Sequence, residues 1–545
     1  MQFPALEAAP FLAWGAQVNE GLKQFTDASG SISLQAELSG TGQALTQARL
    51  TGMARKINFN GPSAAENAGG SLQWTMAKGT GETWDIQGHL RLTEGQIYVE
   101  PGVSIKELPL GFILSTPPEG LSLAMQGRLD GRGRWDIGSI NFLHPGVSEL
   151  AFSGVVLSGD KRTVSGTLRA KLSDLGAAYK PYLEPFLLAT GYGTLETAGA
   201  MEATVRVQEN RLTDLRFGFR DVYVDDLAGR FNVAGLNGGL AVNSGPEPVT
   251  TRLHWAGGGL YQLDIGKGQL VLVSQAGNLW LQKKAQLPVL DGGLAIESLR
   301  FEKVGQKDFS MRLDAQLNPV SLTDFCHAMG WPPMQGTVSG RIPGAFYQPG
   351  VLRVGGTLVM QAFDGRFVIQ DLRIERLFGP VPTLDANVLV KEIDLESLTG
   401  AFSFGKIQGR LSGQVKRLRL EDWQPVYFEA AFASPEEDDK PHRISQRAVE
   451  NLTSLGGGMT VSAASGILLR MFDEFSYDRL GLKCHLHEGV CDMDGVEPVD
   501  GGYYIVKRGL LPPWIDVKGF NRQVDWDVLV ERLKGVTASE GPVIE

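Results

Sequence analysis

The stretch Ile407-Gln-Gly-Arg-Leu411-Ser-Gly-Gln-Val415-Lys-Arg-Leu-Arg-Leu420 decides the fold class of this chain. Up to Val415, apolar residues and glycines occupy the odd positions and polar residues occupy the even positions. Because side chains of a strand point to opposite faces in turn, this alternation predicts a strand with one apolar and one polar face.

The same alternation recurs along most of the chain. It is found at residues 32–38, 84–92, 121–129, 164–172, 201–207, 215–219 and 311–317. The connections are short and rich in Gly, Asn, Asp and Glu, which is typical of hairpins. We therefore predict a mainly β protein with a long antiparallel sheet and a few short helices near the ends. Such a sheet has to split into sandwiches, close into a barrel, or curl into a trough.

The composition is that of a folded protein, with 43% hydrophobic and 21% charged residues among 545. A net charge of -10 argues against a nucleic-acid partner, which would require a basic surface. The sequence contains neither an apolar run of ~20 residues nor a basic N-terminal signal region. Taken literally this places the chain in the cytoplasm; the alternative is that it is the C-terminal part of a longer protein.

Helices are expected at a few places only, at residues 11–28, 173–190, 321–329, 441–455, 466–477 and 525–534. We divide the chain into an N-terminal helical segment (1–30), an elongated β-groove (31–435), a helical insertion (436–480) and a C-terminal part with strands and a terminal helix (481–545). The acidic run 436–439 is interpreted as a solvated loop before a helix rather than a cation site.

The three cysteines allow several interpretations. Cys484 and Cys491 flank His485, His487 and a Glu-Gly turn, which predicts a hairpin with both cysteines at disulfide distance. Inert thiols and a zinc site of two thiolates and two imidazoles remain alternatives. Cys326 is expected to be a buried helix residue.

No sequence motif indicates catalysis. The segment 400–407 looks like a phosphate-binding loop, but Ile407 stands where such a loop needs Ser or Thr, and a strand follows instead of a helix. No nucleophile elbow and no zinc-protease pair is present. We therefore expect no enzymatic activity, no cofactor and no metal.

Residues 398–428, which include the opening stretch, resemble the C-terminal region of the AsmA-like proteins of Gram-negative envelopes. That superfamily includes the TamB, YhdP and YdbH families, and the YdbH-like proteins are the most similar. Further matching segments are 442–449, 475–480, 501–506 and 515–526. The resemblance is sharp over about 395–535; upstream only the style of glycine-punctuated strands matches.

The resemblance implies a periplasmic protein associated with the inner membrane, with a long sheet curled into a taco-like hydrophobic groove. It implies phospholipid as the cargo, carried between inner and outer membrane, and an outer-membrane lipoprotein as a candidate partner at the C-terminal end. We find no segment that matches the anchoring helix of that family, so we expect either that Met1 is an internal start of an N-terminally truncated form or that a separate chain carries the anchor.

A groove of this kind would expose far more apolar surface than a monomer tolerates, and acyl chains are a natural occupant. The residues that we expect to line it are Val205, Phe217, Phe219, Leu313, Leu317, Ile407, Leu411 and Val415. Helices at 441–477 and 525–534 would cap or gate one end. The rival interpretations are an outer-membrane β-barrel and a structural β-solenoid or adhesin of the envelope.

Overall fold

The computed structural model of the chain divides into two units, each described here by itself. The first comprises 1–261 and 269–283, and the second comprises 262–268 and 284–545. The structure describes residues 2–10, 26–42, 44–100, 104–105, 108–109, 111–157, 163–188, 192–329, 336–377, 379, 381–455, 460–461, 472–510 and 512–538.

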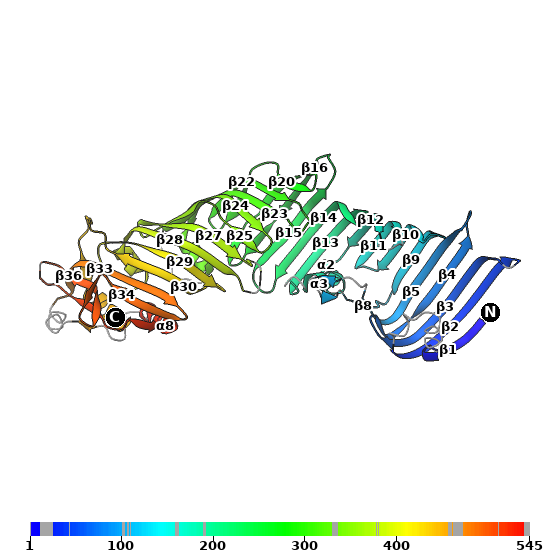
Figure 1. Cartoon of the computed structure of the whole chain (residues 1–545), viewed down its shortest axis with the longest axis horizontal. Coiled ribbons are helices and arrows are strands. Elements are labelled where there is room, and N and C mark those ends of the chain that lie inside the picture. The colour runs from blue at the N-terminus through cyan, green and yellow to red at the C-terminus, as the bar shows by residue number, and fades with distance from the viewer. Residues whose placement is uncertain are drawn as a thin grey trace, which may run out of the picture. The chain divides into compact units, whose positions relative to one another are not determined.

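The first unit is an antiparallel sheet whose main strands pair in chain order (Figure 1). Its strands are β1 (Gln2–Glu7), β2 (Thr26–Thr41), β3 (Ala44–Asn60), β4 (Ala64–Lys78), β5 (Thr83–Val99), β6 (Ser104–Ile105), β7 (Leu108–Pro109), β8 (Phe112–Ser115), β9 (Leu121–Asp130), β10 (Arg134–His144), β11 (Ser148–Leu157), β12 (Thr163–Leu172), β13 (Leu195–Gln208), β14 (Arg211–Asp226), β15 (Phe231–Asn243), β16 (Val249–Trp255), β17 (Gly257–Leu260), β19 (Gly268–Gln275) and β20 (Asn278–Leu281).

In the described residues a helical segment follows β12 and interrupts these strands, as the sequence predicts. It consists of α2 (Leu175–Ala178), a π-helical turn (Tyr179–Leu183) and α3 (Glu184–Leu188). Asp174 caps its start, because its carboxylate accepts a hydrogen bond from the Ala177 N–H at 3.1 Å. The segment packs its apolar side on the sheet over Leu172 and Val222.

The second unit is also antiparallel, and it is better covered by helices. Its strands are β18 (Leu263–Ile265), β21 (Ala285–Val289), β22 (Gly292–Glu302), β23 (Ser310–Ser321), β24 (Gly336–Gln348), β25 (Val351–Arg353), β26 (Thr357–Ala362), β27 (Gly365–Glu375), β28 (Thr383–Asp394), β29 (Arg410–Glu421), β30 (Gln424–Ala433), β31 (Arg443–Ser445), β32 (Thr460–Val461), β33 (Glu474–His487), β34 (Val490–Gly495), β35 (Glu497–Val499), β36 (Gly502–Arg508), β37 (Val517–Gly519) and β38 (Gln523–Asp525). Its helices are α4 (Leu322–Met329), α5 (Leu395–Ala401), α6 (Gln446–Leu455) and α8 (Trp526–Ala538).

The predicted fold class is confirmed: the protein is mainly β, antiparallel, and carries few and short helices. The helices expected at 173–190, at 321–329 and after Asp525 are present. The Asp525 carboxylate accepts from the Val528 N–H at 3.0 Å and so starts the last helix.

Three local predictions were wrong. The segment 1–30 contains strand at Gln2–Glu7 and again from Thr26, while residues 11–25 lie outside the described part. The helix expected at 466–477 is strand from Glu474 onward, and 462–471 lie outside the description. Finally, Arg443–Ser445 is a strand, so the helix after it begins at Gln446.

Candidate functional site

One face of the first unit carries an unbroken row of apolar residues across eleven strands. Each residue lies directly opposite the next in the strand register, so all of them share one face. The row runs from β2 to β15 and consists of Leu34, Gly52, Leu72, Leu90, Leu123, Phe142, Leu150, Ala170, Ala203, Phe217 and Leu240.

Two further rows lie next to it on the same face, one beyond the other, and are apolar throughout as well. The first consists of Ala36, Leu50, Trp74, Gly88, Met125, Ile140, Phe152, Leu168, Val205, Leu215 and Val242. The second consists of Leu38, Ala48, Met76, Ile86, Gly127, Ile137, Gly154, Gly166, Val207 and Leu212. We call these three rows together the apolar face.

The opposite side of the same strands is mainly polar and charged, with single apolar residues such as Met53 among them. Cross-strand ion pairs join Arg128 to Asp85 at 2.8 Å and Lys171 to Glu149 at 3.2 Å. Exposed pairs of this kind add little stability, but they keep this side hydrated. The sheet of the first unit therefore has one water-compatible side and one apolar side.

Glycines within the apolar face make room for aromatic rings. A Cβ atom on Gly88 would lie 2.5 Å from the Trp74 ring, so the indole extends over the glycine of the neighbouring strand. In the same way, a Cβ atom on Gly166 would lie 2.8 Å from the Phe152 ring, so this ring extends over Gly166. The glycines in the apolar phase are thus contact points that let large rings lie flat on the face.

Much of the apolar face is accessible to solvent. Leu90 is 44% exposed and Leu168 is 40% exposed, although both lie in the middle of their strands. These exposed fractions show that the apolar face is only partly covered at these two positions.

Of the residues predicted to line a groove, two belong to the apolar face, and Phe219 lies beside it on the same side of β14. Val205 and Phe217 occupy its rows on β13 and β14. Phe219 stacks on Phe217 with ring centroids 6.1 Å apart, and it packs against the cluster under the helical segment α2–α3. In this cluster Leu175 and Ala178 of the helical segment are buried against Leu172 of β12 and Val222 of β14.

The second unit has a corresponding row, which runs from an accessible part into a filled core. It consists of Leu294, Leu317, Gly340, Leu358, Ile369, Val388, Val415, Ala430, Cys484 and Met493. Leu317 and its neighbour Leu313 are half-buried on β23. Helices α4 and α5 then cover the middle of the row, where Phe363 and Ile393 are buried.

The remaining three predicted residues belong to the filled core rather than to an open surface. Ile407 is 3% exposed and forms an isolated bridge with Ile444 instead of continuing β29. Leu411 and Val415 pack against the same core cluster, which contains Phe475 and Tyr503. The opening alternation therefore ends in a packed interior, because β31, α6 and β33 cover it.

The acidic run 436–439 differs from its prediction as well. The Asp438 side chain is fully buried and accepts hydrogen bonds from the Arg410 N–H at 2.6 Å and from His442 Nε2 at 3.1 Å. Burial raises the pKa of Asp438, but the hydrogen bonds from the Lys440 and Arg410 amides and from His442 outweigh it, so its pKa lies below the ordinary value. Asp438 is a structural anchor of the second unit.

The cysteine hairpin has the predicted turn and the predicted disulfide. Cys484 and Cys491 are bonded, with Cα atoms 5.6 Å apart. His487 pairs with Val490, so Glu488 and Gly489 alone form the loop, both with positive φ. Cys326 is buried in α4, as expected.

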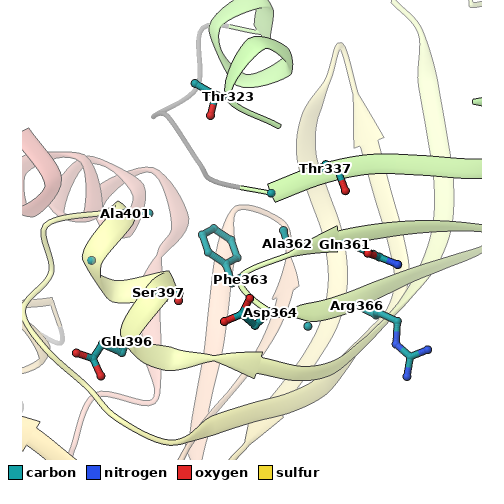
Figure 2. A pocket seen from close by; sticks show the side chains of 13 residues that line it. Thr323, Thr337, Gln361, Ala362, Phe363, Asp364, Arg366, Glu396, Ser397 and Ala401 are labelled. Atoms are coloured by element: carbon teal, nitrogen blue, oxygen red, sulfur yellow. The ribbon is translucent and has the colours of Figure 1, made fainter. Parts of the chain in front are cut away.

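A hollow of about 1200 Å³ lies between α4, the β26–β27 turn and α5 (Figure 2). Phe363 forms one wall, and Asp364, Arg366 and Glu396 supply charge. Glu396 is already engaged by the Gln408 side-chain amide at 3.0 Å.

No protein-family model, no curated protein and no solved structure matches this chain. In the part of the chain that the structure describes, we find no helix with the length and apolar character needed to cross a membrane.

Proposed function

We propose that the apolar face holds the acyl chains of phospholipids and conducts them along the sheet, with no chemistry involved. The observation that carries this proposal is the three adjacent rows without a single polar side chain, two of which cross eleven strands and one ten. A filled core would not leave Leu90 and Leu168 at 44% and 40% exposure.

The length and energetics of the face suit a linear hydrocarbon. Ten steps between neighbouring strands at about 4.8 Å each give an apolar path of about 48 Å. Each methylene that leaves water for this face contributes about 0.8 kcal/mol. Since the rows are continuous, an acyl chain could advance from one strand to the next without returning to water. It would meet no polar side chain along this path.

The periplasm of a Gram-negative cell is the compartment that we propose, with the inner and outer membranes as donor and acceptor. The resemblance of residues 395–535 to the AsmA-like proteins supports this assignment. The Cys484–Cys491 disulfide supports it too, because structural disulfides persist in oxidising compartments. A lipoprotein of the outer membrane is a candidate partner on the same grounds.

Site-specific photo-crosslinking tests the proposal. A photoreactive residue is placed at Leu90 on the apolar face, and a matched one at Met53, which is 54% exposed on the opposite side of the same sheet. The full-length chain is produced in the Gram-negative periplasm, irradiated, and analysed by mass spectrometry. We expect phospholipid adducts at position 90 and none at position 53.

Two results would overturn this reasoning. Adducts of equal yield at both positions would indicate non-specific contact with lipid. Absence of adducts at Leu90 and also at Leu168, which lies four strands further along the sheet in the adjacent row, would show that the face does not hold lipid. A probe at Ile407 would be uninformative, because that side chain is in the core.

A further inference from the structure

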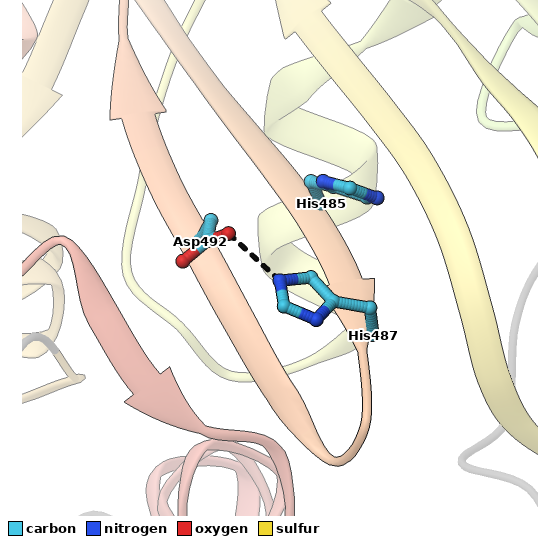
Figure 3. Close-up of side chains that lie close together, drawn as sticks. All are labelled: His485, His487 and Asp492. Atoms are coloured by element: carbon cyan, nitrogen blue, oxygen red, sulfur yellow. Dashed lines mark hydrogen bonds and ion pairs between the residues drawn. The ribbon is translucent and has the colours of Figure 1, made fainter.

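Two histidines and one aspartate gather on the polar side of the β33–β34 hairpin (Figure 3). His485 and His487 are two residues apart on β33 and therefore point to the same side. Asp492 lies on β34 directly opposite His485. The potential ligand atoms of all three side chains lie within 4.8 Å of one another.

The chemistry of these three groups is that of a site for a borderline divalent metal ion. Imidazole nitrogen together with one carboxylate is a ligand set used for Zn²⁺, with a water molecule in the fourth position. Ligand atoms about 2.0–2.1 Å from a tetrahedral ion would be about 3.3 Å apart. His487 Nε2 and Asp492 Oδ2 are 2.9 Å apart, so small side-chain rotations would suffice.

Neighbouring residues orient His485 and Asp492 by hydrogen bonds and leave at least one ligand atom of each without such a bond to them. His485 Nε2 is 3.1 Å from the Tyr427 hydroxyl, which leaves the other ring nitrogen for an ion. Gln523 donates to Asp492 Oδ1 at 3.3 Å and leaves Oδ2 on the histidine side. Such partners around a ligand fix its orientation and are typical of metal sites.

The hairpin itself is rigid and excludes a competing ligand set. The disulfide between Cys484 and Cys491 links the two strands on the buried side of the hairpin. Since the cysteines and the histidines lie on opposite sides, a zinc site made of two thiolates and two imidazoles cannot form. Lys483, the nearest ammonium group along β33, is 3.6 Å from Asp494 rather than paired with Asp492.

We propose that His485, His487 and Asp492 bind one Zn²⁺ ion on the outside of the hairpin, independently of lipid. This site replaces our expectation from the sequence that the chain has no metal site. The ion would join β33 to β34 on the polar side, opposite the disulfide on the apolar side.

Zinc titration of the untagged, full-length, oxidised protein tests this proposal, with a chromogenic chelator as competitor. We expect one Zn²⁺ per chain, and a loss of affinity of at least about tenfold in Asp492→Asn and in His487→Ala. Asp492→Asn keeps the size of the side chain and an oxygen that accepts hydrogen bonds, so the hairpin should fold unchanged, which circular dichroism checks. His89→Ala, on an exposed position of β5, is the matched control and should bind like the parent.

Cobalt supplies a second readout. Co²⁺ bound by the parent should show the intense visible bands of a tetrahedral site, and Asp492→Asn should lose them. The proposal is refuted if the parent shows no zinc binding below millimolar concentration. It is equally refuted if both site variants retain the affinity and the cobalt spectrum of the parent.

Discussion

Replacing Ile407 by alanine distinguishes a packed interior from an open apolar surface. Ile407 is 3% exposed and packs in the same cluster as Leu395, Ile444 and Phe475. Truncation of a buried isoleucine removes its transfer free energy and leaves a cavity, which together cost about 2–5 kcal/mol. On an open surface the cavity term would be absent.

The matched substitution is Leu168→Ala on the apolar face. Leu168 is 40% exposed, so its truncation loses roughly three-fifths of the transfer free energy of a fully buried leucine side chain, or about 1.5 kcal/mol. Because the site opens to solvent or to lipid, no cavity term is added. The two variants should therefore differ even though both remove a large aliphatic side chain from an alternating stretch.

Hydrogen exchange read by mass spectrometry is the appropriate assay, since a chain with two units need not unfold in one step. In Ile407→Ala, amides of β33 should exchange faster by about 30- to 4000-fold, which corresponds to that cost. In Leu168→Ala, amides of β12 should change by about tenfold. A change of β33 below about fivefold in Ile407→Ala would refute the assignment of Ile407 to a filled core.

Three further changes, at Gly88, at Asp438 and at the disulfide, should each lower the stability of the unit or hairpin in which they lie. Gly88→Val should displace the Trp74 ring, because the new Cβ would lie 2.5 Å from it, and should cost about 1–3 kcal/mol in the unfolding free energy of the first unit. Asp438→Asn should destabilise the second unit by about 3–5 kcal/mol. Since the pKa of Asp438 is lower in the folded protein than in the unfolded chain, the ionised carboxylate stabilises the parent at neutral pH. The parent should lose this contribution to the unfolding free energy as the pH falls below about 4. Reduction of Cys484–Cys491 should remove about 2.5 kcal/mol from the β33–β34 hairpin, the entropy of a short closed loop, measured as faster amide exchange.

Matched controls make these outcomes decisive. Gly218→Ala is expected to be neutral, because the nearest atom to its new Cβ would be 3.9 Å away. Asp439→Asn changes an adjacent carboxylate that is largely exposed, and it should alter the unfolding free energy by less than about 1 kcal/mol. If Gly88→Val and Gly218→Ala change the unfolding free energy equally, the Trp74 ring does not rest on Gly88. If Asp438→Asn and Asp439→Asn change it equally, Asp438 is not a structural anchor.

The alternation of the sequence predicted the strands and their apolar side, because a period of two follows directly from strand geometry. Val205 and Phe217 were correctly placed on that side. The sequence could not distinguish an open face from a filled core. Ile407 and Leu90 occur in equally regular alternating stretches, and only the strands and helices that pack over one of them make the difference.

Polar clusters were harder to predict, because they depend on distant pairings. Asp438 appeared to be one of four solvated acidic residues, yet its partner Arg410 is 28 residues away. The grouping of His485, His487 and Asp492 was concealed by the neighbouring cysteines, which share the segment but face the opposite side. A hairpin register worked out from the Glu-Gly turn would have revealed it.

The in-register rows of the first unit have a consequence for how such a protein can change in length during evolution. A duplicated hairpin adds two strands, so it would extend the apolar path by about 10 Å. The register of the existing strands would not change, so all three rows would stay aligned. Deletion of one residue inside a strand would instead turn its leucines to the wet side. Lineages of this chain should therefore tolerate gains and losses of whole hairpins and changes at turns, while single-residue insertions within strands should be rare except at bulges.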